Sequence, residues 1–278
     1  MRNIRLILAY DGGDFVGWQV QPNGRSVQAV VEQAIQKLTG ETVRVMAAGR
    51  TDSGVHALGQ VINFPLAHSI PCDRIRRGLQ NFLPSDVVVV NADEVPPEFH
   101  ATYSAVKKRY RYVIHQSPVR SPFLERYVWS RSDDLDIDRM QQAADCLLGK
   151  QDFRCFESHF PNKATSVRTV LEAKLFRAGG WAVWNPCSLN NAKDQVETKG
   201  PFLCFEIVAD GFLYNMVRAI MGTLFKVGRG KWSPGDVRKI IDQQDRALAG
   251  ETAPAQGLYL VSVDYEEAIN RNASDDRV

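Results

Sequence analysis

Apolar and polar positions alternate along the first segment of the chain, IRLILAY (4–10), which predicts a strand. From 27 to 38 the apolar residues instead recur at intervals of three and four, which predicts a helix with Ser26 as its N-cap and Gly40 as its stop. The same patterns predict the remaining elements of this half: strands over 43–48 and 60–64, a helix between Pro71 and Pro84, and a buried strand over 87–90.

The second half of the chain repeats this arrangement. The predicted elements are strands over 109–115, 168–177, 202–209 and 258–265, helices over 137–148, 212–228 and 234–243, and a polar loop over 188–200. The first half follows the order β-α-β-β-α-β, that of a ferredoxin-like (RRM-like) unit, and the second half repeats it with two successive helices before its last strand. We therefore predict an α+β protein with one such half over 1–104, a second over 105–270 and a polar tail over 271–278. Sheets of this kind often bind RNA, although the fold alone does not prove that use.

Composition narrows the class of protein. The 278 residues are 44% apolar and 24% charged, as is typical of soluble globular proteins. No apolar run is long enough for a membrane helix, and the N-terminus begins with a strand pattern, so a cytoplasmic location is expected. The five cysteines form no C-x-x-C pair and the five histidines no H-E-x-x-H motif. Neither a disulfide framework nor a metal site is therefore predicted.

Charge is unevenly distributed along the chain. The net charge is only +2, yet the segment from Ala105 to Arg131 carries seven Lys or Arg residues and a single acid, Glu125. Such a segment is suited to a polyanion such as RNA, and equally to a solvated strand edge. Charge by itself leaves both interpretations open.

The segment AAGRTDSGVHALGQV (47–61) places a dense polar loop between two predicted strands. Asp52 in this loop has two interpretations. Thr-Asp-Ser-Gly is favourable turn chemistry, in which an aspartate bonds its own backbone. A rigid loop is also what a reactive carboxylate requires, and the neighbouring Arg50 would keep it ionised. The D-S-G tripeptide of aspartic proteases is present only once, whereas that chemistry needs two carboxylates.

Two further features are candidates for a site. Tyr110 and Tyr112 of KKRYRYVIH fall on one face of a strand, where they form either a stacking platform for bases or part of a core. Arg218 interrupts the apolar helix FLYNMVRAIMGTLFKVG, so it is either a surface residue or a buried cation that needs an anionic partner.

Taken together, these motifs resemble one family closely. The stretches that carry the resemblance are YDGGDFVGWQVQPNGRSVQ (10–28), GRTDSGVHALGQV (49–61), FHATYSAVKKRYRY (99–112), FLYNMVRAIMGTL (212–224) and GLYLVSVDY (257–265). In this order they are similar to the TruA-type tRNA pseudouridine synthases. The resemblance implies isomerisation of uridine to pseudouridine on the 3′ side of the tRNA anticodon stem-loop, at tRNA positions 38, 39 and/or 40. It also implies a homodimer without metal or cofactor, in which the two halves share one continuous, mostly antiparallel sheet with helices on one face and a catalytic cleft between them.

The resemblance assigns roles to individual residues. Asp52 corresponds to the catalytic aspartate, a nucleophile, and Tyr110 to the tyrosine stacked on the target uracil. Arg218 corresponds to the basic residue that pairs with the aspartate, and Arg50 to the residue that fills the space of the flipped base. The basic residues next to Tyr110 in KKRYRYVIH are expected to contact RNA phosphates: Lys107, Lys108, Arg109 and Arg111.

Two points remain open at the level of sequence. A non-catalytic RNA-binding module would use the same basic strand and the same aromatic face, but it would gain nothing from a carboxylate beside RNA phosphates. The segment 181–200 is longer than the short hairpin expected for the family, which leaves its role open.

Overall fold

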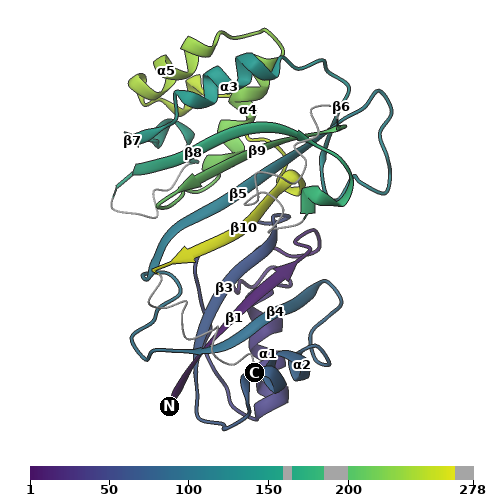
Figure 1. The fold of residues 1–278 in the computed structure, drawn as a ribbon, viewed down its shortest axis with the longest axis vertical. Coiled ribbons are helices and arrows are strands. Elements are labelled where there is room, and N and C mark those ends of the chain that lie inside the picture. The colour runs from purple at the N-terminus through teal and green to yellow at the C-terminus, as the bar shows by residue number, and fades with distance from the viewer. Residues whose placement is uncertain (159–164, 185–199, 267–278) are drawn as a thin grey trace. The chain divides into compact units, whose positions relative to one another are not determined.

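The computed structural model describes residues 1–158, 165–184 and 200–266 (Figure 1). The chain forms two compact units. The first contains residues 1–108 together with those from Leu260 onward, and the second contains residues 109–259. The division therefore falls at 108/109, four residues from the 104/105 boundary taken from the sequence pattern, and the last strand is assigned mainly to the first unit.

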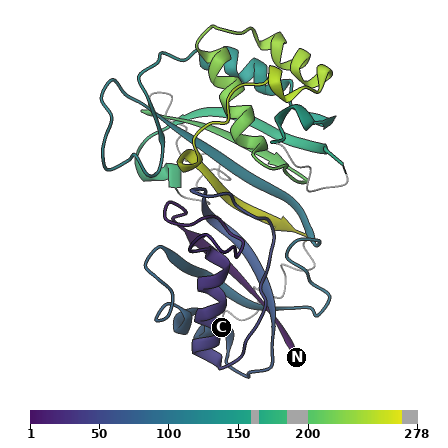
Figure 2. The same ribbon diagram turned by 180° about the vertical axis from the view of Figure 1, so that it is seen from behind.

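The first unit is a mostly antiparallel sheet with two helices on one face (Figures 1 and 2). Its elements are β1 (Arg2–Tyr10), α1 (Val27–Thr39), β2 (Met46–Ala47), β3 (His56–Leu66), α2 (Cys72–Leu79) and β4 (Val87–Val95). The strand order is β4-β1-β3, with β2 and the C-terminal strand β10 (Leu258–Tyr265) both next to β3. The β1–β3 register pairs Ile4 with Phe64 and Leu6 with Ile62, and all four side chains are buried.

Local signals explain α1. The Ser26 side chain accepts a hydrogen bond from the Ala29 amide at the first turn, which satisfies one of the otherwise unpaired N–H groups. Gly40 ends the helix with a φ of 77°, a left-handed conformation that favours glycine. The apolar positions between them, including Val31 and Ile35, are buried in the core of this unit, as the pattern predicted.

The second unit has the same general construction, with helices on one face of a sheet (Figures 1 and 2). Strand β5 (Ala105–Gln116) enters it from the first unit. The other elements are β6 (Trp129–Arg131), α3 (Ile137–Asp145), β7 (Gly149–Asp152), β8 (Val167–Ala178), β9 (Phe202–Ala209), α4 (Met216–Gly228) and α5 (Pro234–Gln243). The strand order is β5-β9-β8-β7, and the short β6 pairs in parallel with β5. The α+β class is therefore confirmed.

Several boundaries differ from the sequence pattern for physical reasons. Helix α4 begins at Met216 and not at 212, because Asn215 has a φ of 61° and this left-handed residue cannot continue a helix backward. Strand β2 is reduced to two residues of the predicted six. The predicted buried strand at 87–90 is wrong about burial: Val87 and Val89 are buried, whereas Val88 and Val90 point to solvent.

The remaining expectations concern membrane helices, metal sites and two polar segments. Within residues 1–158, 165–184 and 200–266, no helix is long and apolar enough to cross a membrane. No group of three or more metal-binding side chains occurs among the same residues. The polar tail 271–278 and most of the predicted loop 188–200 lie outside the described residues.

Candidate active site

The loop that carries Asp52 connects β2 to β3 and is fixed by main-chain hydrogen bonds on both sides of the aspartate. The Trp18 amide donates to the Thr51 carbonyl over 3.0 Å, and the Val55 amide donates to the Asp52 carbonyl over 3.1 Å. The second of these closes a turn in which Gly54 has a φ of 77°. Main-chain hydrogen bonds therefore hold the backbone on both sides of Asp52.

Segment 11–18 packs directly against this loop, and two of its glycines make the approach possible. A Cβ atom at Gly12 would lie 2.0 Å from the Val55 carbonyl oxygen, and one at Gly17 would lie 2.8 Å from that of Thr51. Gly17 also has a φ of 110°, which other residues rarely adopt. These two glycines therefore allow the two backbones to come into contact.

Side chains complete the support of the loop. The hydroxyl groups of Tyr10 and Thr51 are hydrogen-bonded at 2.7 Å, and burial raises the pKa of Tyr10 to about 12. Gln60 donates to the Gly49 carbonyl over 2.7 Å. The buried His56 accepts through Nδ1 from the Gly12 amide over 3.0 Å, and the same nitrogen lies 3.2 Å from Asp11 Oδ1. Because each contact lies on a different part of the loop, the whole loop is held as one rigid piece.

Asp52 itself is half-buried at the surface of this rigid loop, and its neighbour Arg50 is exposed. A half-buried carboxylate on a backbone held from both sides remains accessible, which covalent or acid-base catalysis requires. The turn interpretation and the catalytic interpretation of this loop are thus compatible, because the turn bonds use the main chain and the neighbouring side chains.

Tyr110 and Tyr112 both lie on β5 and have different surroundings. Tyr112 is fully buried, and its hydroxyl donates to the Pro254 carbonyl over 2.8 Å; burial raises its pKa well above the ordinary value. Tyr110 keeps 8% of its surface exposed, and its ring meets that of Phe212 edge-to-face at 4.9 Å. Tyr112 is therefore a core residue, whereas a small part of the Tyr110 side chain remains exposed to solvent.

Arg218 lies in the first turn of α4, where its guanidinium is held by two neighbours. Its Nε donates to the Ala253 carbonyl over 2.7 Å, and Nη1 donates to Asn215 Oδ1 over 2.8 Å. The Ala253 amide in return donates to the Arg218 carbonyl. Asn215 is itself fixed, because its side-chain amide donates to the Ser158 hydroxyl over 3.0 Å. This reciprocal anchoring gives a half-buried cation a defined direction, which the sequence pattern alone did not reveal.

The basic residues of β5 form more ion pairs and hydrogen bonds within the protein than the sequence suggested. Lys107 lies 3.5 Å from the Asp264 carboxylate, and Lys108 donates to the Ala48 carbonyl. Arg109 forms ion pairs with Glu206 and Glu172 at 2.8 and 3.2 Å.

Arg111 requires a correction. Its side chain has no exposed surface, because it pairs with Glu206 at 2.6 Å and donates to the Val183 carbonyl. It therefore has no surface to offer to an RNA phosphate in this structure. The signal that would have revealed this is Glu206 itself: a lone acid in the apolar run FLCFEIVA must find a buried cation.

Comparison with known proteins places this arrangement in a class. The model of the tRNA pseudouridine synthase family matches residues 6–104 and 143–266. The chain therefore belongs to the tRNA pseudouridine synthases and is an isomerase that acts on tRNA uridine. Residues 105–142, which include Tyr110, lie between the two matched ranges.

Individual relatives narrow the class further. The chain is 44% identical to the tRNA pseudouridine synthase A of Acetivibrio thermocellus, over 95% of this chain and all of the relative. It is 43% identical to the protein of the same name from Syntrophomonas wolfei, over 96% of this chain and 99% of the relative. The one from Brevibacillus brevis is also 43% identical, over 95% of this chain and all of the relative. The similarity is thus to pseudouridine synthases of the A type along nearly the whole chain.

Proposed function

We propose that the protein converts uridine to pseudouridine in the anticodon stem-loop of tRNA, at tRNA positions 38, 39 and/or 40, with Asp52 as the catalytic nucleophile. In this reaction the N1–C1′ bond breaks and a C5–C1′ bond forms. The hydrogen at C5 leaves as a proton and N1 gains one, so the composition of the nucleotide is unchanged. The observation that carries the proposal is the half-buried Asp52 on a loop whose backbone is fixed from both sides.

The other residues receive roles that fit their surroundings. Flipping a uridine out of a stem costs a few kcal/mol of stacking. The exposed Arg50 would fill the vacated space, and the ring of Tyr110 would stack on the flipped uracil. Arg218, whose guanidinium is already oriented by Asn215 and Ala253, would pair with the Asp52 carboxylate and fix its direction. Lys107, Lys108 and Arg109 would add positive charge for the RNA backbone.

We further propose that the two units are ferredoxin-like halves of one continuous sheet with the catalytic cleft between them. The order β4-β1-β3-β2 is that of a ferredoxin-like unit, and β5-β9-β8 repeats its β1-β3-β2 part. A homodimer and a cytoplasmic location follow from the same resemblance. For the dimer, light scattering should give twice the chain mass of 31.2 kDa.

The function is tested with an unmodified tRNA transcript that carries tritium at C5 of its uridines. Only a uridine whose C5 joins C1′ releases its tritium to water, so release should follow enzyme addition and stop at one to three equivalents per tRNA. Transcripts with cytidine at position 38, 39 or 40 should each lose the corresponding equivalent. Full release from a transcript that lacks all three uridines would contradict the anticodon assignment.

A non-catalytic RNA-binding module remains the competing function. It would bind the same transcript through the same basic residues and release no tritium at any enzyme concentration. Binding without release, by a protein with an ordinary thermal unfolding transition, would favour this alternative.

Two substitutions distinguish a role of the Tyr110 ring from a role of its hydroxyl group. Tyr110→Ala removes the ring and should lower tRNA affinity or turnover by roughly 5- to 150-fold, since a base–aromatic stack contributes about 1–3 kcal/mol. Tyr110→Phe keeps the ring and its contact with Phe212 and should retain most activity if stacking is the whole role. Single-turnover tritium release measures both variants. Normal activity of Tyr110→Ala would show that this ring does not contact the substrate.

A further inference from the structure

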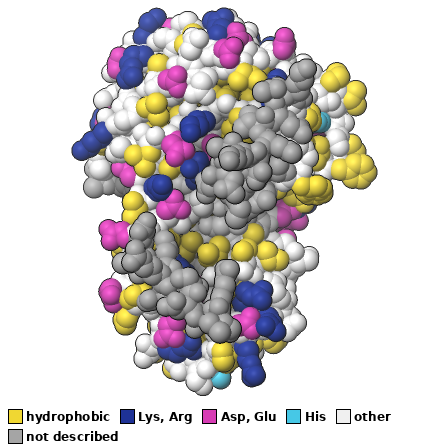
Figure 3. All heavy atoms as spheres, in the orientation of Figure 1, with side chains coloured by type: hydrophobic (Ala, Val, Ile, Leu, Met, Phe, Trp, Pro, Cys, Tyr) yellow, Lys and Arg dark blue, Asp and Glu magenta, His cyan; other side chains and the backbone are white. Residues whose placement is uncertain are grey.

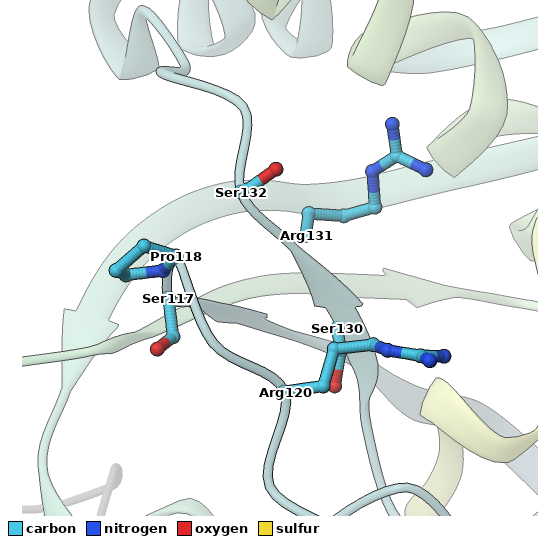
Figure 4. A pocket seen from close by; sticks show the side chains of 6 residues that line it. All are labelled: Ser117, Pro118, Arg120, Ser130, Arg131 and Ser132. Carbon is cyan, nitrogen blue, oxygen red and sulfur yellow. The ribbon is translucent and has the colours of Figure 1, made fainter.

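One cavity of the second unit is bordered by chain that leads directly to Arg218. Its volume is about 460 Å³, and its lining is Asp245, Arg246, Ala247, Ala249, Gly250 and Glu251. Further along the same chain, the Ala253 carbonyl accepts the hydrogen bond from Arg218 Nε. The cavity in Figure 4, of about 310 Å³, is formed instead by residues within 117–132, and the Arg131 guanidinium there points away from the serines. Residues 249–254, here called the 249–254 segment, therefore both border the larger cavity and hold Arg218.

The 249–254 segment is attached to α4 at two places. Near its C-terminal end the Ala253 amide donates to the Arg218 carbonyl over 3.1 Å, in the first turn of the helix. Near its N-terminal end the Gly250 amide donates to Thr223 Oγ1 over 2.8 Å, further along the helix. The residue numbers fall in one element as they rise in the other. The segment therefore runs antiparallel to α4 and spans more than one helical turn.

Between these two attachments the backbones are in direct contact, and two glycines allow it. A Cβ atom at Gly222 would lie 1.8 Å from the Glu251 carbonyl oxygen, and one at Gly250 would lie 2.5 Å from the Thr223 amide nitrogen. Glycine is the residue that permits such a close approach of two backbones. The segment is thus held flat against α4, and a change at Gly250 displaces a short, continuous piece of chain that includes Ala253.

Thr223 supplies one of the two attachments through a hydroxyl group inside the protein. The residue is only 1% exposed. Its Oγ1 donates to the Ala219 carbonyl over 2.9 Å and accepts from the buried Gly250 amide. Without the hydroxyl this amide would lose its acceptor, and a buried N–H group without a partner favours any rearrangement that brings it to water or to another acceptor. Thr223 therefore stabilises the docked position of the segment.

The direction of the Ala253 carbonyl is restricted from its other side as well. Pro254 follows it, and the residue before a proline is biased toward extended conformations. The Pro254 carbonyl in turn accepts from the Tyr112 hydroxyl over 2.8 Å. With Thr223 holding the start of the segment and Tyr112 its end, the Ala253 carbonyl is fixed between two anchors.

We propose that Thr223 is a positioning residue for the pseudouridine reaction. Its hydroxyl docks the 249–254 segment on α4, and the docked segment sets the direction of the Arg218 guanidinium through the Ala253 carbonyl. Because Thr223 is buried, it acts through these groups and not by contact with the RNA. The inference rests on the proposed function, since it gives a supporting role to the residue proposed to pair with Asp52.

The test begins with Thr223→Val, which replaces the hydroxyl by a methyl group of similar size. It should lower the single-turnover rate of tritium release roughly 10-fold, because the buried Gly250 amide loses its acceptor. The affinity for tRNA should remain that of the unchanged protein, because no group that faces the RNA is altered. Thr223→Ser restores the hydroxyl and should return the rate to near its original value. A normal rate in Thr223→Val would overturn the proposal.

The matched control is Thr39→Val, at the end of α1 in the first unit. Thr39 Oγ1 makes the same pair of bonds: it donates to the Ile35 carbonyl over 2.8 Å and accepts from the Glu41 amide over 3.1 Å. Its loss should lower the temperature of thermal unfolding and leave the rate of tritium release unchanged. Equal rate losses in the two valine variants would reduce the effect of Thr223 to general stability and contradict the positioning role.

A second variant changes the segment without altering the interior of α4. Half-buried Arg246 donates to the Gly250 carbonyl over 2.9 Å and to the Thr252 hydroxyl oxygen over 3.0 Å. Arg246→Ala removes both bonds and should also lower the rate. Figure 3 shows positive and negative side chains interspersed over the helices of this unit, and Lys239→Ala on α5 is the control for removing one cation. A loss in Arg246→Ala alone supports the proposal, whereas equal losses would trace the effect to charge and count against it.

A measurement without RNA follows the Arg218 side chain directly. Its Nε–H group donates to the Ala253 carbonyl, so the NMR signal of this group reports the position of that carbonyl. The signal is identified by its loss in Arg218→Lys. Thr223→Val should shift the signal and speed its hydrogen exchange with water, Thr223→Ser should restore both, and Thr39→Val should change neither. An unchanged signal in Thr223→Val would refute the inference.

These measurements separate the inference from the catalytic proposal. A protein that releases no tritium, but in which Thr223→Val still moves the Arg218 signal, refutes the function and supports the positioning of this side chain. Normal release by the unchanged protein, together with an unchanged rate in Thr223→Val, refutes the positioning role alone. Adding Thr223→Val to Arg218→Ala should cause little further loss, and additive losses would show that Thr223 does not act through Arg218.

Discussion

Replacing Asp52 with asparagine is expected to abolish tritium release from tRNA, with a rate loss of at least about 10³-fold, or roughly 4 kcal/mol of transition-state stabilisation. Asparagine has nearly the same shape, but its amide is not a nucleophile and carries no charge to stabilise a cationic sugar. The fold should persist, because the turn bond from the Val55 amide goes to the Asp52 carbonyl and not to its side chain.

Two further measurements accompany this substitution: tRNA binding by the variant, and the activity of a control variant. Asp52→Asn should bind tRNA at least as tightly as the unchanged protein, because a negative charge beside phosphates is removed. The matched control is Asp14→Asn, which changes an exposed carboxylate in the segment that packs against the same loop. That control should keep its activity. An active Asp52→Asn enzyme would show that another group does the chemistry.

Arg218→Ala is expected to have the second largest effect, a fall in the single-turnover rate of about 10²-fold, or roughly 2.7 kcal/mol. The guanidinium is oriented by the Ala253 carbonyl and by Asn215 Oδ1, so alanine removes both the charge and the direction that these contacts impose. Arg218→Lys keeps the charge but loses the planar fork, and it should recover only part of the rate.

The proposed pairing of Arg218 with Asp52 can be tested separately with a double-variant cycle. If Arg218 acts by orienting the Asp52 carboxylate, then adding Arg218→Ala to Asp52→Asn should cause little further loss. Additive losses would give Arg218 an independent role. Lys226→Ala, on the last turn of the same helix, serves as the control for removing a cation from α4, and its rate should remain close to that of the unchanged protein.

Elements with local signals at both ends were predicted well. Helix α5 spans 234–243 and β10 spans 258–265, as the pattern indicated. For α5 the reason is visible in the structure: Ser233 and Asp236 form a capping box, and Pro234 occupies the first helical position. These interactions join residues within one turn of helix, so the sequence contains everything needed to place them.

Elements whose limits depend on distant residues were predicted less well. The pattern extended α4 back to 212, because Phe212 and Leu213 continue its apolar run; the left-handed Asn215, whose side chain bonds to Ser158, begins the helix later. The exposure of Arg111 was likewise misjudged. Strand alternation gives its face of the sheet, but what covers that face depends on Glu206 and Val183, both more than 70 positions away.

The sequence by itself determined the family and the α+β class, and it singled out Asp52, because long motifs and helix caps are local properties of the chain. Only the tertiary structure decided how the aspartate loop is stiffened and which cations of the basic segment face solvent. It alone brought Gly12 and Gly17 against the loop and buried Arg111 against Glu206. The physical reason is that close backbone packing and buried ion pairs join residues far apart in the chain, and no local pattern encodes which distant partner will arrive.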